Sequence, residues 1–150
     1  MATTRTPRRL TSPLDAIEVI LALLDREPTT TLAALLDRLP GPTQVIVPVA
    51  GGDPGPAGAP ELAALLAATL ASGPPPSGPA PAGPPPPRLV LVSVRDHGGD
   101  APVEADLAAW RALVRRSQPW PLELLDWFVV TDEAILSLAE LAGPPARWDG

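Results

Sequence analysis

Apolar positions follow a helical spacing in some parts of the chain and form short continuous runs in others. The first pattern covers residues 13–27, where Leu14, Ile17, Leu21 and Leu24 fall on one face and acidic residues on the other. A cap at Ser12, a proline at the first helical position and Pro28 at the end delimit a predicted helix.

The pattern does not decide whether residues 31–38, the first of the next two apolar runs, form a helix or a strand. Residues 31–38 are rich in leucine and alanine, which favour a helix, whereas residues 44–50 are rich in valine and isoleucine, which favour a strand. A turn at residues 39–42 joins them, so the pair forms a hairpin if the first run is also a strand. Pro48 lies within the second run, which predicts an edge position or a bulge there.

The rest of the chain alternates between helix and strand. We expect a helix over residues 60–72 with its leucines inward, a strand at 88–95, a helix at 103–117, a strand at 122–131 and a short helix from 131 to 143. The inward leucines of the first of these helices are Leu62, Leu65, Leu66 and Leu70. This order predicts a single α/β domain in which helices pack on a sheet.

The same patterns set the expected boundaries. The folded domain covers residues 12–143, a flexible tail precedes it at 1–11, and a second tail follows at 144–150. Residues 73–87 are so rich in proline that we expect an exposed connector inside the domain.

Composition and charge exclude several classes of function. The chain has no cysteine, which excludes disulfides and thiolate metal ligands. Its net charge of −6 disfavours nucleic acid as a partner, because an acidic surface repels phosphates. No apolar run is long enough to cross a bilayer, so we expect a cytoplasmic protein that does not bind membranes. Trp110 and Trp127 are expected in the core, whereas Trp120 and Trp148 are the better candidates for contact anchors.

A more specific sequence pattern begins at residue 92. A strand ends in Val94-Arg95-Asp96-His97, a helix opens with the sequence PVEADL at residues 102–107, and the later strand contains LLDWFVV at residues 124–130. These segments resemble the RadC-like branch of the JAB/MPN metalloprotease fold, in particular its degenerate actinobacterial members. In that family the three segments read H-x-H-P-S-G-D, P-S-x-x-D-I and L-L-D-H-x-I-V. The resemblance covers about the last 60 residues and implies a mixed β-sheet flanked by helices.

The resemblance also implies where a metal site would lie. The family supplies two histidines, an aspartate in the following helix, a serine and a glutamate base on the first strand, for a zinc-bound water. His97 matches the second histidine and Asp106 matches the aspartate, two residues closer together than in the family pattern.

The other positions of the family site are substituted in this sequence. Arg95 replaces the first histidine and would repel zinc, and Val103 replaces the serine. The glutamate falls near residues 29–31, all threonine, and Trp127 stands where the family has a later histidine. We therefore expect no catalytic residue, no metal and no cofactor, with His97 and Asp106 as remnants.

Three functions follow from this interpretation. The first is a catalytically inactive RadC-like domain that acts in protein interaction or scaffolding with an unidentified protein partner. The second is a metal-dependent hydrolase with an altered zinc site at His97 and Asp106. The third is binding of a small ligand by Arg95 and the Gly98-Gly99 loop in the vacated pocket. A serine nucleophile at Ser93 fits poorly, because the residue lies within a strand with no sharp turn around it.

Overall fold

A computed structural model describes residues 13–38, 43–52, 55, 57–71, 87–95, 104–132 and 134–142. The expected tails, most of the proline-rich connector, His97 and Trp148 lie outside these residues. The elements are α1 (Pro13–Arg26), β1 (Thr30–Arg38), β2 (Thr43–Ala50), α2 (Gly58–Ala71), β3 (Arg88–Val94), α3 (Glu104–Arg116), β4 (Glu123–Val130), β5 (Ile135–Ser137) and α4 (Leu138–Ala142).

The five strands form one mixed sheet in the order β2-β1-β3-β4-β5. β1 is antiparallel to both β2 and β3, β4 is antiparallel to β5, and β3 and β4 run parallel. The crossover between the two parallel strands contains α3. The chain is thus a single α/β domain with a mixed sheet, as expected.

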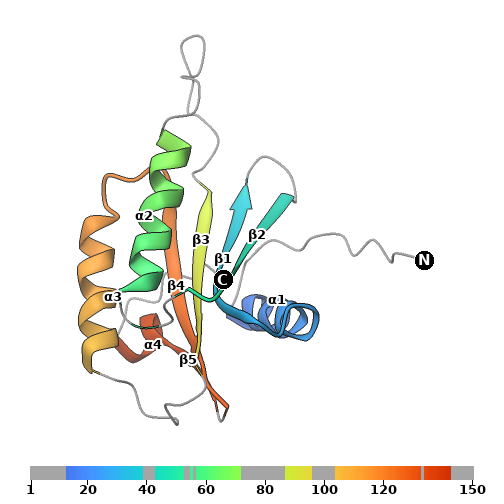
Figure 1. Cartoon of the computed structure of the whole chain (residues 1–150). Coiled ribbons are helices and arrows are strands. Elements are labelled where there is room, and N and C mark those ends of the chain that lie inside the picture. Colours follow the sequence, from blue (N-terminus) through green and yellow to red (C-terminus); the bar gives the residue numbers. More distant parts are fainter. Residues whose placement is uncertain are drawn as a thin grey trace.

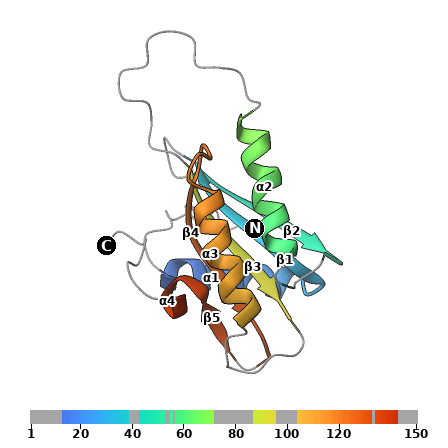
Figure 2. The same cartoon turned by 90° about the vertical axis from the view of Figure 1, so that its left-hand side faces the viewer.

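Helices cover both faces of this sheet (Figures 1 and 2). α2, α3 and α4 lie on one face, where they bury Ala63, Trp110 and Leu138 with the side chains of β1, β3 and β4 that point that way. α1 lies on the other face, where Ile20 packs among the alternate side chains of the same three strands. The three central strands are therefore buried on both sides, as strands covered by two helical layers must be.

β1 resolves the choice that the sequence left open at residues 31–38. The segment is a strand in spite of its leucine and alanine content, because it lies between β2 and β3 and pairs with both. Its side chains alternate between the two core clusters, with Leu32 and Ala34 on one face and Ala33 and Leu35 on the other. Tertiary pairing outweighs the helix propensity of the segment.

β2 is an edge strand, and Pro48 lies exposed within it opposite Ala33. The position confirms the edge that its proline predicted, because proline has no backbone N–H to donate and is tolerated where one side of the strand has no partner.

On α1 and α2, the most buried residues are not the row of leucines that the sequence pattern indicated. On α2 the buried row is Ala59, Ala63 and Ala67, whereas Leu65, expected inward, is 64% exposed. On α1 the buried residues are Ala16, Ile20 and Leu23, and Leu14 is 64% exposed. On α2, the small residues at the contact allow the helix to approach the sheet closely, and the leucines then lie at the rim or in solvent.

β4 contains an irregularity that the sequence pattern does not show. Leu89 pairs with Leu124 but Val90 pairs with Asp126, so β4 has one extra residue at this point. The extra residue resets the alternation, which places Trp127 on the α3 face and Phe128 on the α1 face. The C-terminal segment also differs from expectation. In place of one helix from residue 131, it forms the short strand β5 and then the five-residue helix α4.

The alanine row of α2 provides a test of the fold. We expect Ala63→Leu to lower the free energy of unfolding by about 1–3 kcal/mol, because Ala63 is fully buried against the sheet and the added atoms have no space. Urea unfolding followed by circular dichroism measures the change.

Ala68→Leu is the matched control on the exposed side of the same helix and should shift stability by less than about 0.5 kcal/mol. Equal effects of the two substitutions would contradict the packing of α2 described above.

Candidate functional site

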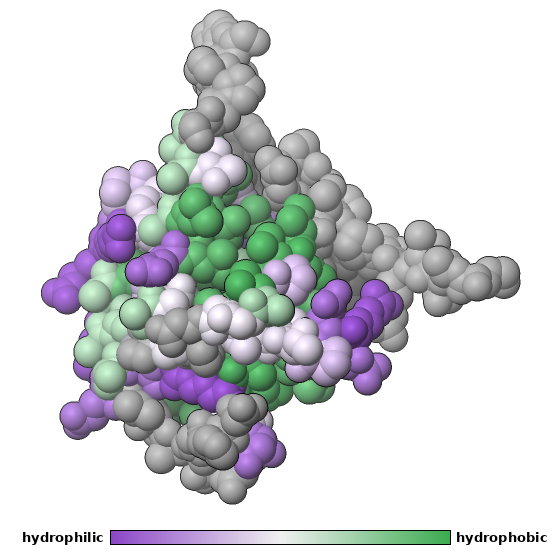
Figure 3. Space-filling model, in the orientation of Figure 1, coloured by the Kyte–Doolittle hydropathy of each residue, from purple (hydrophilic) through white to green (hydrophobic). Residues whose placement is uncertain are grey.

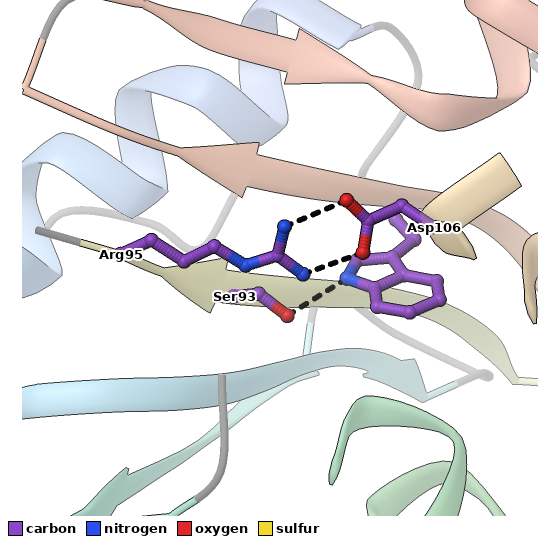
Figure 4. A network of polar contacts seen from close by, with 4 residues as sticks. Ser93, Arg95 and Asp106 are labelled. Carbon is purple, nitrogen blue, oxygen red and sulfur yellow. Dashed lines mark hydrogen bonds and ion pairs between the residues drawn. The ribbon is translucent and has the colours of Figure 1, made fainter. Parts of the chain in front are cut away.

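The candidate site lies at the carboxyl ends of the parallel strands β3 and β4, beside the first turn of α3. Ligands in α/β sheets commonly bind at this kind of position, outside the carboxyl ends of parallel strands. In this chain the place contains Ser93 and Arg95 from the β3 end, Asp106 from α3 and Trp127 from β4 (Figure 4).

Arg95 and Asp106 form a two-pronged ion pair. The Nη1 atom of Arg95 donates to Oδ2 of Asp106 and Nη2 donates to Oδ1, both at 2.7 Å. The side chain of Arg95 is 16% exposed and that of Asp106 only 3%. Parallel hydrogen bonds between a guanidinium and a carboxylate are among the strongest polar contacts in proteins. Both carboxylate oxygens of Asp106, the residue compared with a metal ligand of the family, are therefore hydrogen-bonded to the Arg95 guanidinium.

Local structure explains why these two side chains meet. Leu89, Leu91 and Ser93 point to the helical layer along β3, and Arg95 continues this alternation by one step. The Arg95 amide donates to the Val130 carbonyl at 2.8 Å, which extends the parallel pairing past the end of the strand.

α3 supplies the carboxylate of the pair. Its buried face includes Asp106, Trp110 and Leu113, at the spacing of successive helical turns. Asp106 is thus the first-turn member of a face that packs on the sheet. The helix dipole at this end also favours a negative charge.

Trp127 and Ser93 make the second polar contact of the site. The indole Nε1 of Trp127 donates to the Ser93 Oγ at 2.9 Å, and both residues are fully buried. The contact satisfies the one polar atom of the indole inside an aliphatic core. A serine that accepts this bond inside the core is not placed to attack a substrate, which agrees with the poor fit of Ser93 to a nucleophile.

Thr31 lies near the position where the family has its glutamate base. Its hydroxyl donates to the Gly52 carbonyl at 2.9 Å and to the Val49 carbonyl at 3.3 Å. The residue lies at a register shift between β1 and β2, and its side chain ties the two strand ends together. A hydroxyl in this role is structural and is no base.

Of the remaining positions compared with the family, His97, the Gly98-Gly99 loop and Val103 lie outside the described residues. Within the part of the chain that the structure describes, no group of three or more histidine, cysteine or acidic side chains is arranged to hold a metal ion. Of the two expected remnants, the structure therefore locates Asp106 alone, and its partner is Arg95.

A second buried carboxylate, Asp126, lies at the bulge of β4. Its Oδ1 accepts from the Trp127 amide at 2.7 Å and from the Ala139 amide at 3.2 Å, and its Oδ2 accepts from the Ser137 hydroxyl at 2.6 Å. The Ser137 hydroxyl also accepts from the Glu140 amide at 3.1 Å and so caps α4. Asp126 thus holds β5 and α4 against the sheet, a structural role.

Two tryptophans fulfil the expectation of core packing, and a third is partly buried. Trp110 and Trp127 are 4% and 0% exposed. Trp120 packs against the same core, and the guanidinium carbon of Arg116 lies 5.9 Å from its ring centroid.

Among the described residues, no helix has the length and apolar character needed to cross a membrane.

From the sequence, Arg95 was interpreted as the replacement of a metal ligand and Asp106 as a metal ligand that is still present, without a relation between the two. The ion pair between them was not predicted. A signal did exist, because two ligands of one metal ion must lie close together, and opposite charges at two such positions predict an ion pair.

The ion pair predicts a strong dependence of each partner on the other. Arg95→Leu alone should lower the free energy of unfolding by about 3 kcal/mol, because it leaves the buried Asp106 carboxylate without a counterion. The double variant Arg95→Leu/Asp106→Leu should lose clearly less, since no buried charge remains. Denaturant unfolding of wild type, both single variants and the double variant gives the coupling energy. Additive losses would show that the pair does not form in solution.

The network of Asp126 generates a second expectation. Ser137→Ala should lower stability by about 2 kcal/mol, because it removes both the cap of α4 and a hydrogen bond to a buried carboxylate. Thr69→Ala removes an exposed hydroxyl that bonds within α2 and should change stability by less than about 0.5 kcal/mol. Thermal unfolding of the two variants measures both effects, and a neutral Ser137→Ala would refute the role given to Asp126.

The polar groups of the site are paired with one another, and residues 96–103, between β3 and α3, lie outside the described residues. The resemblance to RadC-like domains is one of sequence motifs alone. Comparison with protein-family models, with curated proteins and with solved structures finds no match for this chain.

Proposed function

We propose that this chain is a catalytically inactive RadC-like domain of the JAB/MPN type, which acts in protein interaction or scaffolding. The observation that carries the proposal is the ion pair between Arg95 and Asp106. In the family that the sequence resembles, these two positions hold two ligands of one zinc ion. Here the guanidinium supplies the positive charge that the carboxylate would otherwise receive from the metal.

The geometry of the pair disfavours zinc on two grounds. Both carboxylate oxygens of Asp106 are engaged at 2.7 Å, so a metal would have to displace the guanidinium first. The displaced guanidinium, a cation, would then remain close to a divalent cation. Catalytic zinc takes three protein ligands and a water, and His97 alone would remain from the matched positions.

Other positions support the same conclusion independently. Trp127 fills the place of a family histidine with an indole bonded to Ser93 in the core. Thr31, near the place of the family's base, binds two carbonyls at the end of the hairpin. Each of these substitutions takes away a different part of the hydrolytic chemistry, so restoring any one of them should not restore activity.

A domain that keeps its packing while its site is closed by internal bonds still presents a surface. Both helical layers and the mixed sheet are retained around the substituted site. This combination supports the proposed role in protein interaction, with the hydrolase and ligand-binding alternatives as outcomes of the test below.

Metal analysis of the purified chain tests the proposal. After incubation with zinc and removal of the excess, we expect far less than one zinc per chain, and no difference between wild type and His97→Ala. Stoichiometric zinc that is lost on His97→Ala and on Asp106→Asn would overturn the proposal in favour of the altered hydrolase.

Arg95→Leu provides a control for the same measurement, because it frees the Asp106 carboxylate without adding a ligand. It should leave the chain without stoichiometric zinc. Zinc binding by this variant would show that the guanidinium alone excludes the metal and that the other ligands are still in place.

A further inference from the structure

A basic patch lies at the C-terminal end of α3 and in the turn that follows it. It comprises Arg111, Arg115 and Arg116, which are all exposed, and the half-buried Trp120, and we call it the α3 patch. Three of the 11 basic residues of the chain thus lie within about two turns of one helix. In Figure 3, which has the orientation of Figure 1, hydrophilic surface lies on the side of the molecule that α3 forms.

The arginines of this patch have no carboxylate close enough to neutralise them. Among the described residues, none of the three forms an ion pair. Asp106, the acidic residue that precedes the patch in the sequence, is paired with Arg95. In Glu123, the acidic residue that follows it, Oε2 lies 3.9 Å from Nε of Arg88. The patch therefore keeps its positive charge in a protein whose net charge is −6.

The stability of α3 explains the patch only in part. The helix dipole favours cations in the last turn, which accounts for Arg115 and Arg116. It does not account for Arg111, which lies one turn earlier on the same side of the helix as Arg115. Like charges at this spacing repel each other and destabilise a helix. An anion from outside the chain would remove this repulsion.

Trp120 adds an aromatic ring to the arginines. The guanidinium carbon of Arg116 lies 5.9 Å from the centroid of this ring, a cation–π contact that holds the two side chains together. Trp120 packs against the core but is not fully covered by it. Tryptophan and arginine are residue types that often dominate the binding energy of protein interfaces. The composition of the patch is therefore typical of a protein-binding surface.

We propose that the α3 patch binds an acidic segment of a partner protein. Carboxylates of that segment pair with Arg111 and Arg115, and an apolar side chain beside them packs on Trp120. The observations favour protein over nucleic acid, because three phosphate contacts bind weakly and the net charge of −6 repels a long phosphate chain. The inference rests on the interaction role proposed above, to which it gives a location and a partner chemistry.

Fluorescence anisotropy with the full chain tests this inference. The probe is a short labelled peptide of glutamate, alanine and leucine, with glutamates one helical turn apart. The wild type should bind it at low salt, and the affinity should fall as salt screens the charges. Arg115→Gln should weaken binding at least about fivefold, the effect of one lost charge-assisted contact.

Arg26→Gln is the matched control for this measurement. Arg26 is also an exposed arginine in the last turn of a helix, but it belongs to α1, on the opposite face of the sheet. Both substitutions change the net charge by the same amount, so only the location of the lost charge differs. Arg26→Gln should leave the affinity for the peptide unchanged.

Charge reversal tests the complementarity of the contact. The double variant Arg111→Glu/Arg115→Glu should lose the acidic peptide. It should also bind a peptide with lysine in place of glutamate more tightly than the wild type does. Circular dichroism verifies that all variants are folded.

Four results would contradict the inference: no binding of the acidic peptide by the wild type, an equal loss in Arg26→Gln, a charge-reversed variant that still binds the acidic peptide, or tighter binding of a single-stranded DNA of equal charge. None of these results bears on zinc content, so failure of the α3 patch and failure of the proposed function are distinguishable.

Discussion

The central strands β1, β3 and β4 must be covered on both faces, and most of the structure follows from this constraint. Their side chains are apolar in both directions, so a single helical layer would leave half of them in water. Among the described helices, α1 covers one face, and α2, α3 and α4 cover the other (Figures 1 and 2). With few aromatic residues, the layers are close-packed through small side chains such as those of Ala33, Ala63 and Ala67. Two of the carboxylates that reach the core, Asp106 and Asp126, have hydrogen-bond partners there.

Sequence patterns predicted the parts of this arrangement that depend on local chemistry. The continuous apolar run of β3 and the proline of the edge strand both predicted their places in the sheet. The strand at residues 31–38 could not be decided, because its two partners are supplied by distant segments. The predicted inward face of α2 was right only in part. Leu62, Leu66 and Leu70 pack at the edge of the core and Leu65 is exposed, because the closest contact with the sheet is made by the smaller alanine side chains. The bulge of β4 leaves no mark in composition.

The site shows a similar division. That Asp106 lies near a helix start and that Arg95 follows a strand were predictable from the sequence, and so were the substitutions that argue against hydrolysis. Their ion pair required the spatial relation between the end of β3 and the first turn of α3. The bond between Trp127 and Ser93 depends in addition on the extra residue of β4, which sets the face that the indole occupies. The residue types allow these contacts, and the long-range geometry of the fold brings the groups together.

The ion pair has a consequence for how this sequence can change over time. A substitution at residue 95 or residue 106 alone leaves a charge in a place that water reaches poorly. Neutral drift at either position is therefore blocked unless the other changes in the same lineage. Among relatives of this chain, the two positions should covary as arginine with a carboxylate, or as two uncharged residues, with few mixed states. Selection for stability alone therefore constrains the residues at positions 95 and 106, whatever surface the domain presents to a partner.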